Sequence, residues 1–307
     1  MHCLLSVNAE PIDVFANPLS LEAGIRIHGS NGTLIYRGGF ELVSSDSRFG
    51  GLSGLIVTRD GATLVAVSDR GWWFQATIGY DQGGNLASMN VAELLRMRSV
   101  DGQYVGAGDW SDAEALLRLP NGELVVAFER HHRLWQYSDS HAAARSMPAY
   151  SVFSDLPLNR GIEALAMLNE GRLLALAESG SSNSSLSGWI LKGTQAEVLH
   201  YPHDGYFRPS DAARIDDHRI LILERGYTEV RGVRARLMLL DVRTVKAGAH
   251  LSPLPLIELG APIPLDNFEG LAARPARGGA LLLYLLSDDN YNPRQRTLFL
   301  MFEFAED

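Results

Sequence analysis

Acidic residues occur in pairs at the two ends of short apolar segments, and the pairing recurs along the 307-residue chain. Between Asn267 and Tyr291, Glu269 lies within "FEGLA", and Asp288 follows the apolar run "LLLYLLS". Carboxylate oxygens are hard ligands that suit Ca²⁺ or Mg²⁺, and a carboxylate in apolar surroundings can also transfer protons. Whether these acids act together depends on how the fold arranges them.

The same arrangement is found in four further segments, which begin at Gly50, Ser111, Arg160 and Arg208. In each segment a polar residue begins a short apolar strand, a turn that usually contains Gly follows, and a continuous apolar run ends on an acid. The first polar positions are Ser53, Glu114, Glu163, Asp211 and Glu269. The acids that end the second runs are Asp69, Glu129, Glu178, Glu224 and Asp288.

Five such units, each with room for four strands in roughly 40–60 residues, predict an all-β fold, a β-propeller of four-stranded blades. Five blades are favoured, and a sixth blade of degenerate N-terminal strands is the alternative. The segment "GGFELVSS" (38–45) takes the place of an outer strand, and we expect it to pair with the C-terminal "TLFLMFEF" (297–304) and close the ring. No linker divides residues 11–307, which we assign to one propeller domain.

Residues 1–10 contain a short apolar run followed by Val7-Asn8-Ala9, small residues at the spacing of a signal-peptidase site. They are either the remnant of an export signal or an ordinary disordered terminus. The first interpretation predicts a periplasmic or secreted protein, whereas a complete N-terminus would indicate a cytoplasmic one. With Cys3 as the one cysteine, neither an intrachain disulfide nor a thiolate metal cluster can form.

Composition narrows the classes of partner. The net charge of −9 argues against nucleic-acid binding, which requires basic surfaces that neutralise phosphates. No run approaches the ~18 apolar residues of a membrane-spanning helix. We therefore expect neither a nucleic acid nor a membrane span, and the sequence leaves the oligomeric state open.

Propeller geometry would gather the paired acids at one mouth of the central channel. Each innermost strand begins there, and the next strand runs antiparallel and returns to the same end. Carboxylates ~8 Å apart repel by about 2 kcal/mol at an effective dielectric constant near 20, so a ring of them requires a cation or bound protons. We expect Ca²⁺ or Mg²⁺ to be bound by Glu114, Glu163, Asp211, Glu269, Asp69 and Asp288. The alternative is that each acid accepts backbone N–H bonds or pairs with a neighbouring arginine.

Other residues near the expected mouth could take part in catalysis or in substrate binding. Arg70 and Arg225 follow acids of the repeat and could hold developing negative charge, and His131 or His132 could act as general acid or base. The predicted substrate-binding residues are Arg130, Arg208, Trp72 and Tyr291. Ser53 is not a nucleophile in a G-x-S-x-G elbow, because Leu55 stands where that motif requires Gly.

The segments "RFGGLSGL", "DGATLVAVSDRG", "GIEALAML", "RPSDAARI" and "DNFEGLA" with "SDDNYNPRQRTLFLMFEF" resemble the phytase-like esterase family, known as "esterase-like activity of phytase". The likeness extends over residues 12 to 305. It implies a propeller, usually exported, whose repeated acids act on phosphoric esters with calcium. A dense lysine patch, which accompanies phosphate binding in propeller phytases, is missing here.

These observations predict a Ca²⁺-dependent phosphoric-ester hydrolase or a related esterase. Two alternatives remain open at this point. One is a metal-dependent lactonase of the gluconolactonase type. The other is an exported propeller that binds a ligand without catalysis, since propellers serve both purposes and the fold alone does not decide between them.

Overall fold

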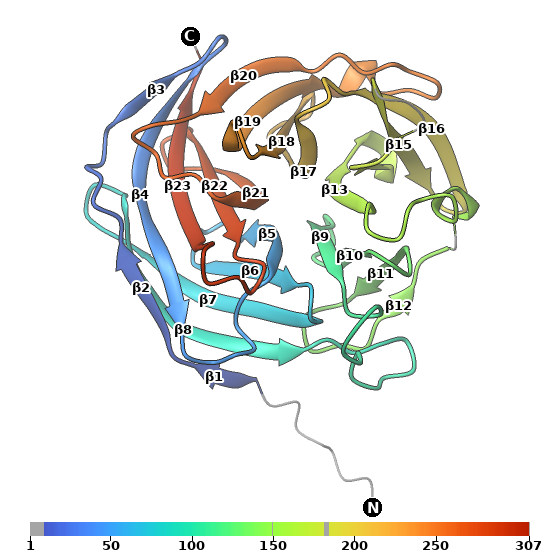
Figure 1. The fold of residues 1–307 in the computed structure, drawn as a ribbon, viewed down its shortest axis with the longest axis horizontal. Coiled ribbons are helices and arrows are strands. Elements are labelled where there is room, and N and C mark those ends of the chain that lie inside the picture. The colour runs from blue at the N-terminus through green and yellow to red at the C-terminus, as the bar shows by residue number, and fades with distance from the viewer. Residues whose placement is uncertain (1–8, 149, 181–183, 307) are drawn as a thin grey trace, which may run out of the picture.

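The structure is a computed structural model that describes residues 9–148, 150–180 and 184–306. Its strands form five antiparallel sheets arranged radially around a central axis (Figure 1), so the predicted five-bladed propeller is confirmed. The helical segments of these residues are three short 3₁₀ turns, η1 (Ser151–Phe153), η2 (Asn169–Gly171) and η3 (Val242–Thr244). Within this part of the chain, no helix has the length and apolarity needed to cross a lipid bilayer.

The blades follow one another in sequence, and in each the innermost strand comes first. Blade 1 contains β5 (Leu52–Val57), β6 (Thr63–Ser68), β7 (Trp72–Tyr80), β8 (Leu86–Arg96) and, at its edge, β1 (Glu10–Ile12). Blade 2 contains β9 (Ala113–Arg118), β10 (Leu124–Phe128), β11 (Arg133–Tyr137) and β12 (Arg145–Ser146). Blade 3 contains β13 (Ile162–Met167), β14 (Leu173–Ala177), β15 (Ser185–Lys192) and β16 (Gln195–Pro202).

The last two blades use both ends of the chain. Blade 4 contains β17 (Arg208–Arg214), β18 (Arg219–Thr228), β19 (Gly232–Asp241) and β20 (Leu254–Leu259). Blade 5 contains β21 (Asn267–Pro275), β22 (Leu281–Asp288), β23 (Thr297–Ala305), β4 (Thr33–Ser44), β2 (Val14–Pro18) and β3 (Arg26–His28).

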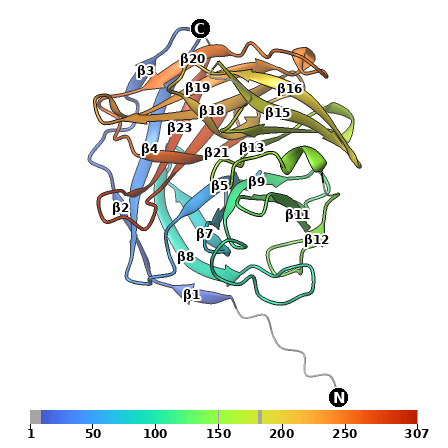
Figure 2. The same ribbon diagram turned by 45° about the vertical axis from the view of Figure 1, so that its right-hand side comes forward.

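The ring is closed by pairing between the N-terminal β4 and the C-terminal β23, as the sequence predicts. The two strands are antiparallel, and Phe40 lies opposite Phe299. Figure 2 shows β4 beside β23 in a second view, while β1 lies at the edge of blade 1 next to β8. The N-terminal segment therefore joins the first blade to the last. Residues 1–8 of the predicted export remnant lie outside the described residues, so export stays a prediction.

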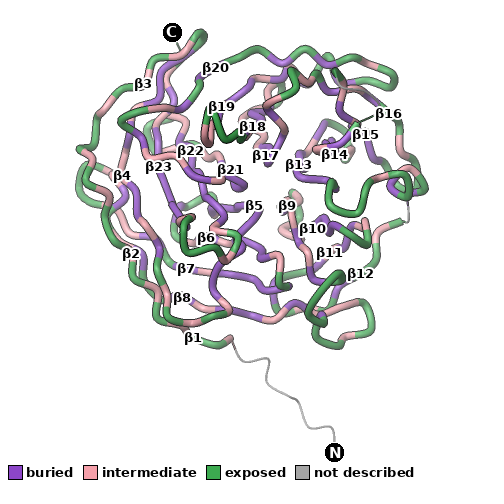
Figure 3. The backbone as a smooth tube through the Cα atoms, viewed as in Figure 1, coloured by how far each residue is buried: buried purple, intermediate pink, exposed green. Residues whose placement is uncertain are grey.

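The core lies between neighbouring blades, because each sheet presents an apolar face to the next. The middle strands are buried on both faces, and every residue of β10 and β14 is buried. Figure 3 shows this burial along the inner and middle strands, with exposed residues in the loops and at the rim. Between blades 1 and 2, Trp73 meets Tyr137 edge to face with ring centroids 5.1 Å apart. Burying an aromatic or leucine side chain of this kind stabilises the fold by about 2 kcal/mol.

Candidate metal centre and active site

Strand register defines two equivalent positions in every blade. At the mouth end, the first two strands of each blade pair as Leu52–Ser68, Ala113–Phe128, Ile162–Ala177, Pro209–Glu224 and Phe268–Ser287. In blades 2 to 5 the inner strand has a β-bulge immediately after this pair, which leaves Glu114, Glu163, Ser210 and Glu269 out of the ladder, whereas in blade 1 the bulge comes one residue later, at Gly54 after the Ser53–Val67 pair. A bulge re-aims the side chains beside it, and here it does so around the channel axis.

The first position, which follows the pair on the inner strand, is occupied by Ser53, Glu114, Glu163, Ser210 and Glu269. The second position, which follows the pair on the next strand, is occupied by Asp69, Glu129, Glu178, Arg225 and Asp288. The predicted equivalence of Asp211 and Glu224 to the other acids is therefore wrong by one residue in each strand. Blade 4 contributes the hydroxyl of Ser210 at the first position, where three other blades have an acid. It contributes the guanidinium of Arg225 at the second position, where the four other blades have an acid.

Asp211 and Glu224 have partners elsewhere in the protein. Asp211 is 1% exposed, and its two carboxylate oxygens accept the N–H groups of Ala212 and Leu271, each at 2.7 Å. Glu224 accepts a hydrogen bond from the Tyr201 hydroxyl at 2.8 Å and another from Arg236 Nε. Both acids thus fit the alternative in which a repeat acid is satisfied by backbone N–H groups or by an arginine.

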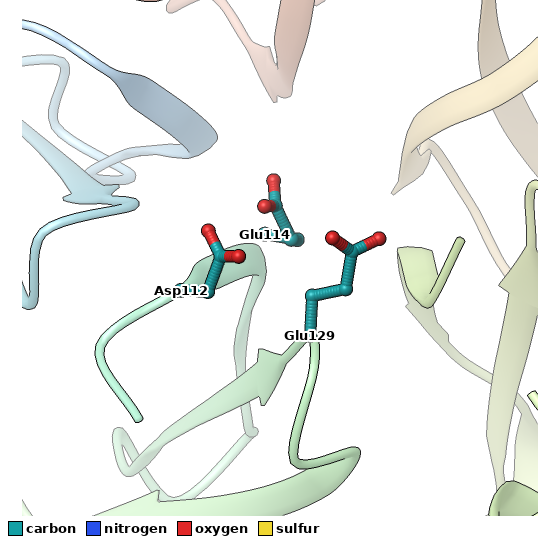
Figure 4. Close-up of side chains that lie close together, drawn as sticks. All are labelled: Asp112, Glu114 and Glu129. Carbon is teal, nitrogen blue, oxygen red and sulfur yellow. The ribbon is translucent and has the colours of Figure 1, made fainter. Parts of the chain in front are cut away.

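Two groups of three carboxylates lie at the mouth of the channel on the side of blades 2 and 3. Within each group, one oxygen from each residue lies within 4.8 Å of the others. The first group is Asp112, Glu114 and Glu129, all from blade 2 (Figure 4). The second group is Glu129, Glu163 and Glu178, so Glu129 belongs to both. Glu129 is held in place by the N–H of Gly161, which donates to its Oε1 at 2.9 Å.

Burial and mutual repulsion raise the pKa of these carboxyl groups. Burial is the larger cause for Glu114 and Glu163, whose pKa values lie well above 4.5, and neighbouring acids raise them further. The pKa of Glu129 rises from 4.5 to about 7 through burial and the charges of Asp112 and Glu178, although the N–H of Gly161 opposes this change. At neutral pH the group therefore holds protons unless a cation replaces them.

Asp69 lies at the same mouth in blade 1, next to blade 2, where the Ser111 hydroxyl donates to its carbonyl at 3.0 Å. Burial, followed by the charge of Asp112, raises its pKa from 3.8 to about 7, and its Oδ1 is buried without a hydrogen-bond partner. Gly51 has φ +58° and packs so closely that a Cβ there would lie 2.3 Å from this oxygen. The Gly51 backbone therefore packs directly against a carboxyl whose pKa is raised toward neutrality.

The acids of blade 5 are satisfied by polar neighbours. Glu269 Oε2 accepts the Ser53 hydroxyl at 2.9 Å, and its Oε1 accepts Asn267 Nδ2 at 2.9 Å. Asp288 accepts the N–H of Asn290 at 2.7 Å, yet burial and the charge of Glu269 still raise its pKa well above 3.8.

Arg225 places a positive charge inside the ring of acids. Its Nη2 lies 2.9 Å from Glu269 Oε1, and its side chain is 29% exposed. Burial lowers its pKa, but a larger opposing effect raises the pKa overall. That effect comes from the negative charges of Glu269, Glu178, Glu163 and Asp288. One guanidinium thus offsets only part of the negative charge at the mouth.

Among the predicted substrate-binding residues, Trp72 and Tyr291 are engaged by arginines. Trp72 is 9% exposed, with the guanidinium carbons of Arg48 and Arg96 5.2 and 4.9 Å from the ring centroid. Arg70 stacks on Tyr291 at 3.2 Å. Trp72 therefore packs between side chains, and Tyr291, on which Arg70 stacks, lies near Asp69 at Gly51.

Arg130 contacts the first carboxylate group, and the two predicted histidines follow it in the chain. Arg130 Nε donates to Asp112 at 2.6 Å. The exposed ring of His131 stacks on Trp110 with centroids 4.0 Å apart. His132 Nε2 lies 3.0 Å from the Pro157 carbonyl, and burial lowers the pKa of this imidazole. Arg208 lies across the channel mouth in blade 4, opposite Arg225 in the ladder.

Sequence reasoning missed Asp112, although a signal for it exists. Asp112 lies two residues before Glu114, and residues separated by two project from the same face of an extended segment. It follows Ser111, whose hydroxyl donates to the Asp69 carbonyl at 3.0 Å and joins the two blades.

The other mouth of the channel opens into a cavity of about 1680 Å³, lined by the hairpin turns and by none of the predicted site residues.

Comparison with solved structures supports the fold. An α-L-arabinofuranosidase from Podospora anserina has 10% sequence identity and a TM-score of 0.51, over 85% of this chain and 93% of that chain. A protein of unknown function from Dyadobacter fermentans has 11% identity and a TM-score of 0.48, over 97% of this chain and 96% of that one. An endo-1,4-β-xylanase from Bacteroides thetaiotaomicron has 8% identity and a TM-score of 0.48, over 84% and 95%. At 10% identity the likeness to the arabinofuranosidase, the one of these three with a TM-score above 0.5, is one of fold alone.

Sequence comparison identifies the family. No curated protein sequence matches the chain. A family model described as "Esterase-like activity of phytase" matches residues 47–291. This match begins just before the first inner strand and ends at Tyr291, so it contains every residue of the two carboxylate groups. The chain belongs to the phytase-like family.

Proposed function

We propose that the protein hydrolyses phosphoric or closely related esters with the help of a divalent cation, Ca²⁺ or Mg²⁺, at the channel mouth. The observation that carries this proposal is the pair of three-carboxylate groups that share Glu129. Membership in a phytase-like family supports an ester as the substrate. The chemistry of the donor set supports the choice of cation, since carboxylate oxygens favour Ca²⁺ and Mg²⁺ over softer metals.

The residues present fit a bound cation. Asp112, Glu114 and Glu129 would hold one ion, and Glu129 with Glu163 and Glu178 offers an adjoining set. Their raised pKa values indicate that negative charge accumulates there without enough compensation. A bound divalent ion supplies Lewis-acid polarisation of the ester and lowers the pKa of coordinated water.

Asp69 is the residue best placed to accept a proton. Its pKa of about 7 matches a general base that works near neutral pH, and its Oδ1 has a free lone pair because no group donates to it. The bonds from Ser53 and Asn267 hold the carboxylate of Glu269 in place. Asp69 would therefore take the proton of the attacking water at Oδ1.

The leaving group requires a proton donor, and His131 is the better placed of the two predicted histidines. It is exposed, it follows Glu129 by two residues, and its ring stacks on Trp110. His132 is less suitable because burial lowers its pKa, which favours the neutral imidazole at neutral pH.

A panel of p-nitrophenyl phosphate, bis-p-nitrophenyl phosphate, p-nitrophenyl acetate and a γ-lactone tests the proposal. We expect turnover of at least one phosphoric ester, its loss in EDTA and its recovery when Ca²⁺ or Mg²⁺ is restored. Glu129→Gln should abolish this turnover, whereas Glu197→Gln, an exposed acid on β16, should not change it. Turnover of the lactone alone would instead support the lactonase alternative. Cation binding without turnover of any substrate would support a binding protein.

A further inference from the structure

Three arginines gather on the side of the mouth formed by blades 3 and 4. Arg208 and Arg225 are direct partners in the ladder of β17 and β18, so their side chains leave the same face of the sheet. Arg208 Nη1 donates to the carbonyl of Glu178, directly after β14. The carbonyl of Arg160 accepts the hydroxyl of the next residue, Ser179, at 2.9 Å. The backbone of Arg160 and the side chain of Arg208 therefore lie at the end of β14, and Arg225 lies beside Arg208 in the ladder.

Some N–H donors of these three guanidinium groups have no acceptor among the described residues. Within residues 9–148, 150–180 and 184–306, the Arg160 side chain makes neither a hydrogen bond nor an ion pair, and that of Arg208 bonds only to the Glu178 carbonyl. Arg225 pairs with Glu269 through Nη2, while its Nε is buried without a partner. The described residues thus leave several N–H groups without an acceptor at one place.

Like charges placed directly opposite in a ladder destabilise a sheet unless something offsets them. Burial lowers the pKa of Arg208, the carboxylate of Glu178 raises it, and the charges of Arg160 and Arg225 lower it further. Glu178 belongs to the second carboxylate group, so a cation bound there would occupy the acid nearest to Arg208. With that acid engaged, Arg208 would lack an acidic partner among the described residues, whereas Arg225 keeps its ion pair with Glu269.

We propose that Arg160, Arg208 and Arg225 form an oxyanion-binding subsite for a phosphate or carboxylate group of the substrate. A guanidinium presents two parallel N–H donors to two oxygens, a geometry that matches both groups. Such a subsite would favour anionic esters over neutral esters and lactones. This effect on substrate selectivity rests on the proposed function. Oxyanion binding itself requires no turnover and can be measured separately.

The subsite and the carboxylate groups depend on each other electrostatically. Glu178 and Glu163 would repel an oxyanion when they are ionised and free. A divalent cation removes this repulsion, so the cation-loaded protein should bind an oxyanion more tightly than the EDTA-treated protein. The arginines keep the bound anion on the blade 4 side, across the mouth from Asp112 and Glu114.

Calorimetric titration of the full chain loaded with Mg²⁺ tests the proposal, with inorganic phosphate in one arm and acetate in the other. We expect saturable binding in at least one arm, and the arm that saturates identifies a phosphoryl or a carboxylate subsite. Arg208→Gln should weaken that binding by about 10-fold, because a charge-assisted hydrogen bond is lost. Arg208→Lys, which keeps the charge without the fork, should weaken it less.

The matched control is Arg118→Gln, because Arg118 is exposed at the far mouth and lines the cavity there. Its phosphate and acetate affinities should equal those of the wild type. Arg160 is also exposed, so Arg160→Gln tests the subsite even if the Arg208 variants do not fold; we expect a loss of about threefold to 10-fold. Thermal melting of each variant establishes that it is folded.

The proposal is overturned if neither anion saturates the protein, or if Arg160→Gln and Arg208→Gln bind the anion as the wild type does. Equal weakening by Arg118→Gln would overturn it as well. These outcomes are distinct from a failure of the proposed function. If phosphate binds through the arginines but no ester is hydrolysed, only the hydrolase is refuted. If charged and neutral esters are hydrolysed equally by the wild type and by Arg208→Gln, only the subsite is refuted.

Discussion

Asp211 Oδ2 accepts the backbone N–H of Leu271 at 2.7 Å, a bond that joins blade 4 to blade 5 at the channel axis. The N–H of Leu271 follows the bulge that presents Glu269. The other oxygen of Asp211 accepts the N–H of Ala212, so this buried carboxylate satisfies backbone groups of two neighbouring blades. Asp211 therefore stabilises the ring and fixes the strand that presents Glu269.

Replacing Asp211 should therefore destabilise the protein without removing a cation. We expect Asp211→Ala to lower the free energy of unfolding by about 3 kcal/mol, because buried N–H groups lose their acceptor. Glu197→Ala, at an exposed position on β16, should change it by less than about 0.5 kcal/mol. Urea unfolding measures both, and calorimetry gives the number of Ca²⁺ ions bound. A lower Ca²⁺ stoichiometry with unchanged stability would show that Asp211 is a ligand after all.

Glu129 should matter more for cation binding than any other acid, because it belongs to both carboxylate groups. Replacing a residue that only supports a metal ligand lowers metal affinity by roughly 10- to 100-fold. Loss of a ligand shared by both groups should therefore lower Ca²⁺ affinity by about 100-fold. We expect this loss of Ca²⁺ affinity for Glu129→Gln. Asp112→Asn and Glu163→Gln should each weaken one group and spare the other. Calorimetric titration separates these cases, and equal effects from all three variants would contradict two adjoining groups.

Without a divalent cation, stability should fall as the pH rises. Asp69 and Glu129 have pKa values of about 7 in the folded protein against 3.8 and 4.5 as ordinary values. Between about pH 4 and pH 7 the folded state binds protons that the unfolded state has released. These protons therefore stabilise the folded protein at low pH, and this stabilisation is lost as pH rises through about 7.

Melting temperatures in EDTA from pH 5 to pH 8.5 measure this loss. Saturating Ca²⁺ should raise the melting temperature most at the alkaline end, because the cation replaces the protons. Asp69→Asn, which does not titrate, should flatten the EDTA curve. A melting temperature in EDTA that rises steadily toward pH 8.5 would contradict the raised pKa values.

Asp69 should affect turnover more than binding, since we assign it the proton of the attacking water. Asp69→Asn should lower kcat by about 100-fold or more, the usual contribution of general-base catalysis, while KM and Ca²⁺ affinity change little. The wild-type kcat should also fall below about pH 7, where Asp69 becomes protonated. Steady-state kinetics across pH tests this assignment. If the kcat of Asp69→Asn falls below about pH 7 in the same way as that of the wild type, Asp69 is not the base.

Much of the fold could be predicted from the sequence because the signals are local and repeated. Apolar runs such as "LVVAF" and "LLALA" fix the buried strands, and the turns between them fix the hairpins. Five copies then determine the number of blades. A strand that returns antiparallel must end where its partner began, so the convergence of Glu129 with Glu114 also followed from the sequence.

The tertiary structure alone decided which residues occupy the equivalent positions in blade 4. The sequence there has acids one residue away from the repeat, at Asp211 and Glu224, and nothing local distinguishes the two registers. Pairing with blade 5 resolves them, because Asp211 meets the N–H of Leu271 while Arg225 meets Glu269. The local sequence pattern thus determined the propeller fold and the end of the channel at which the acids lie. Contacts between blades decided which acids form groups and where the arginines lie, because no short segment of sequence encodes those contacts.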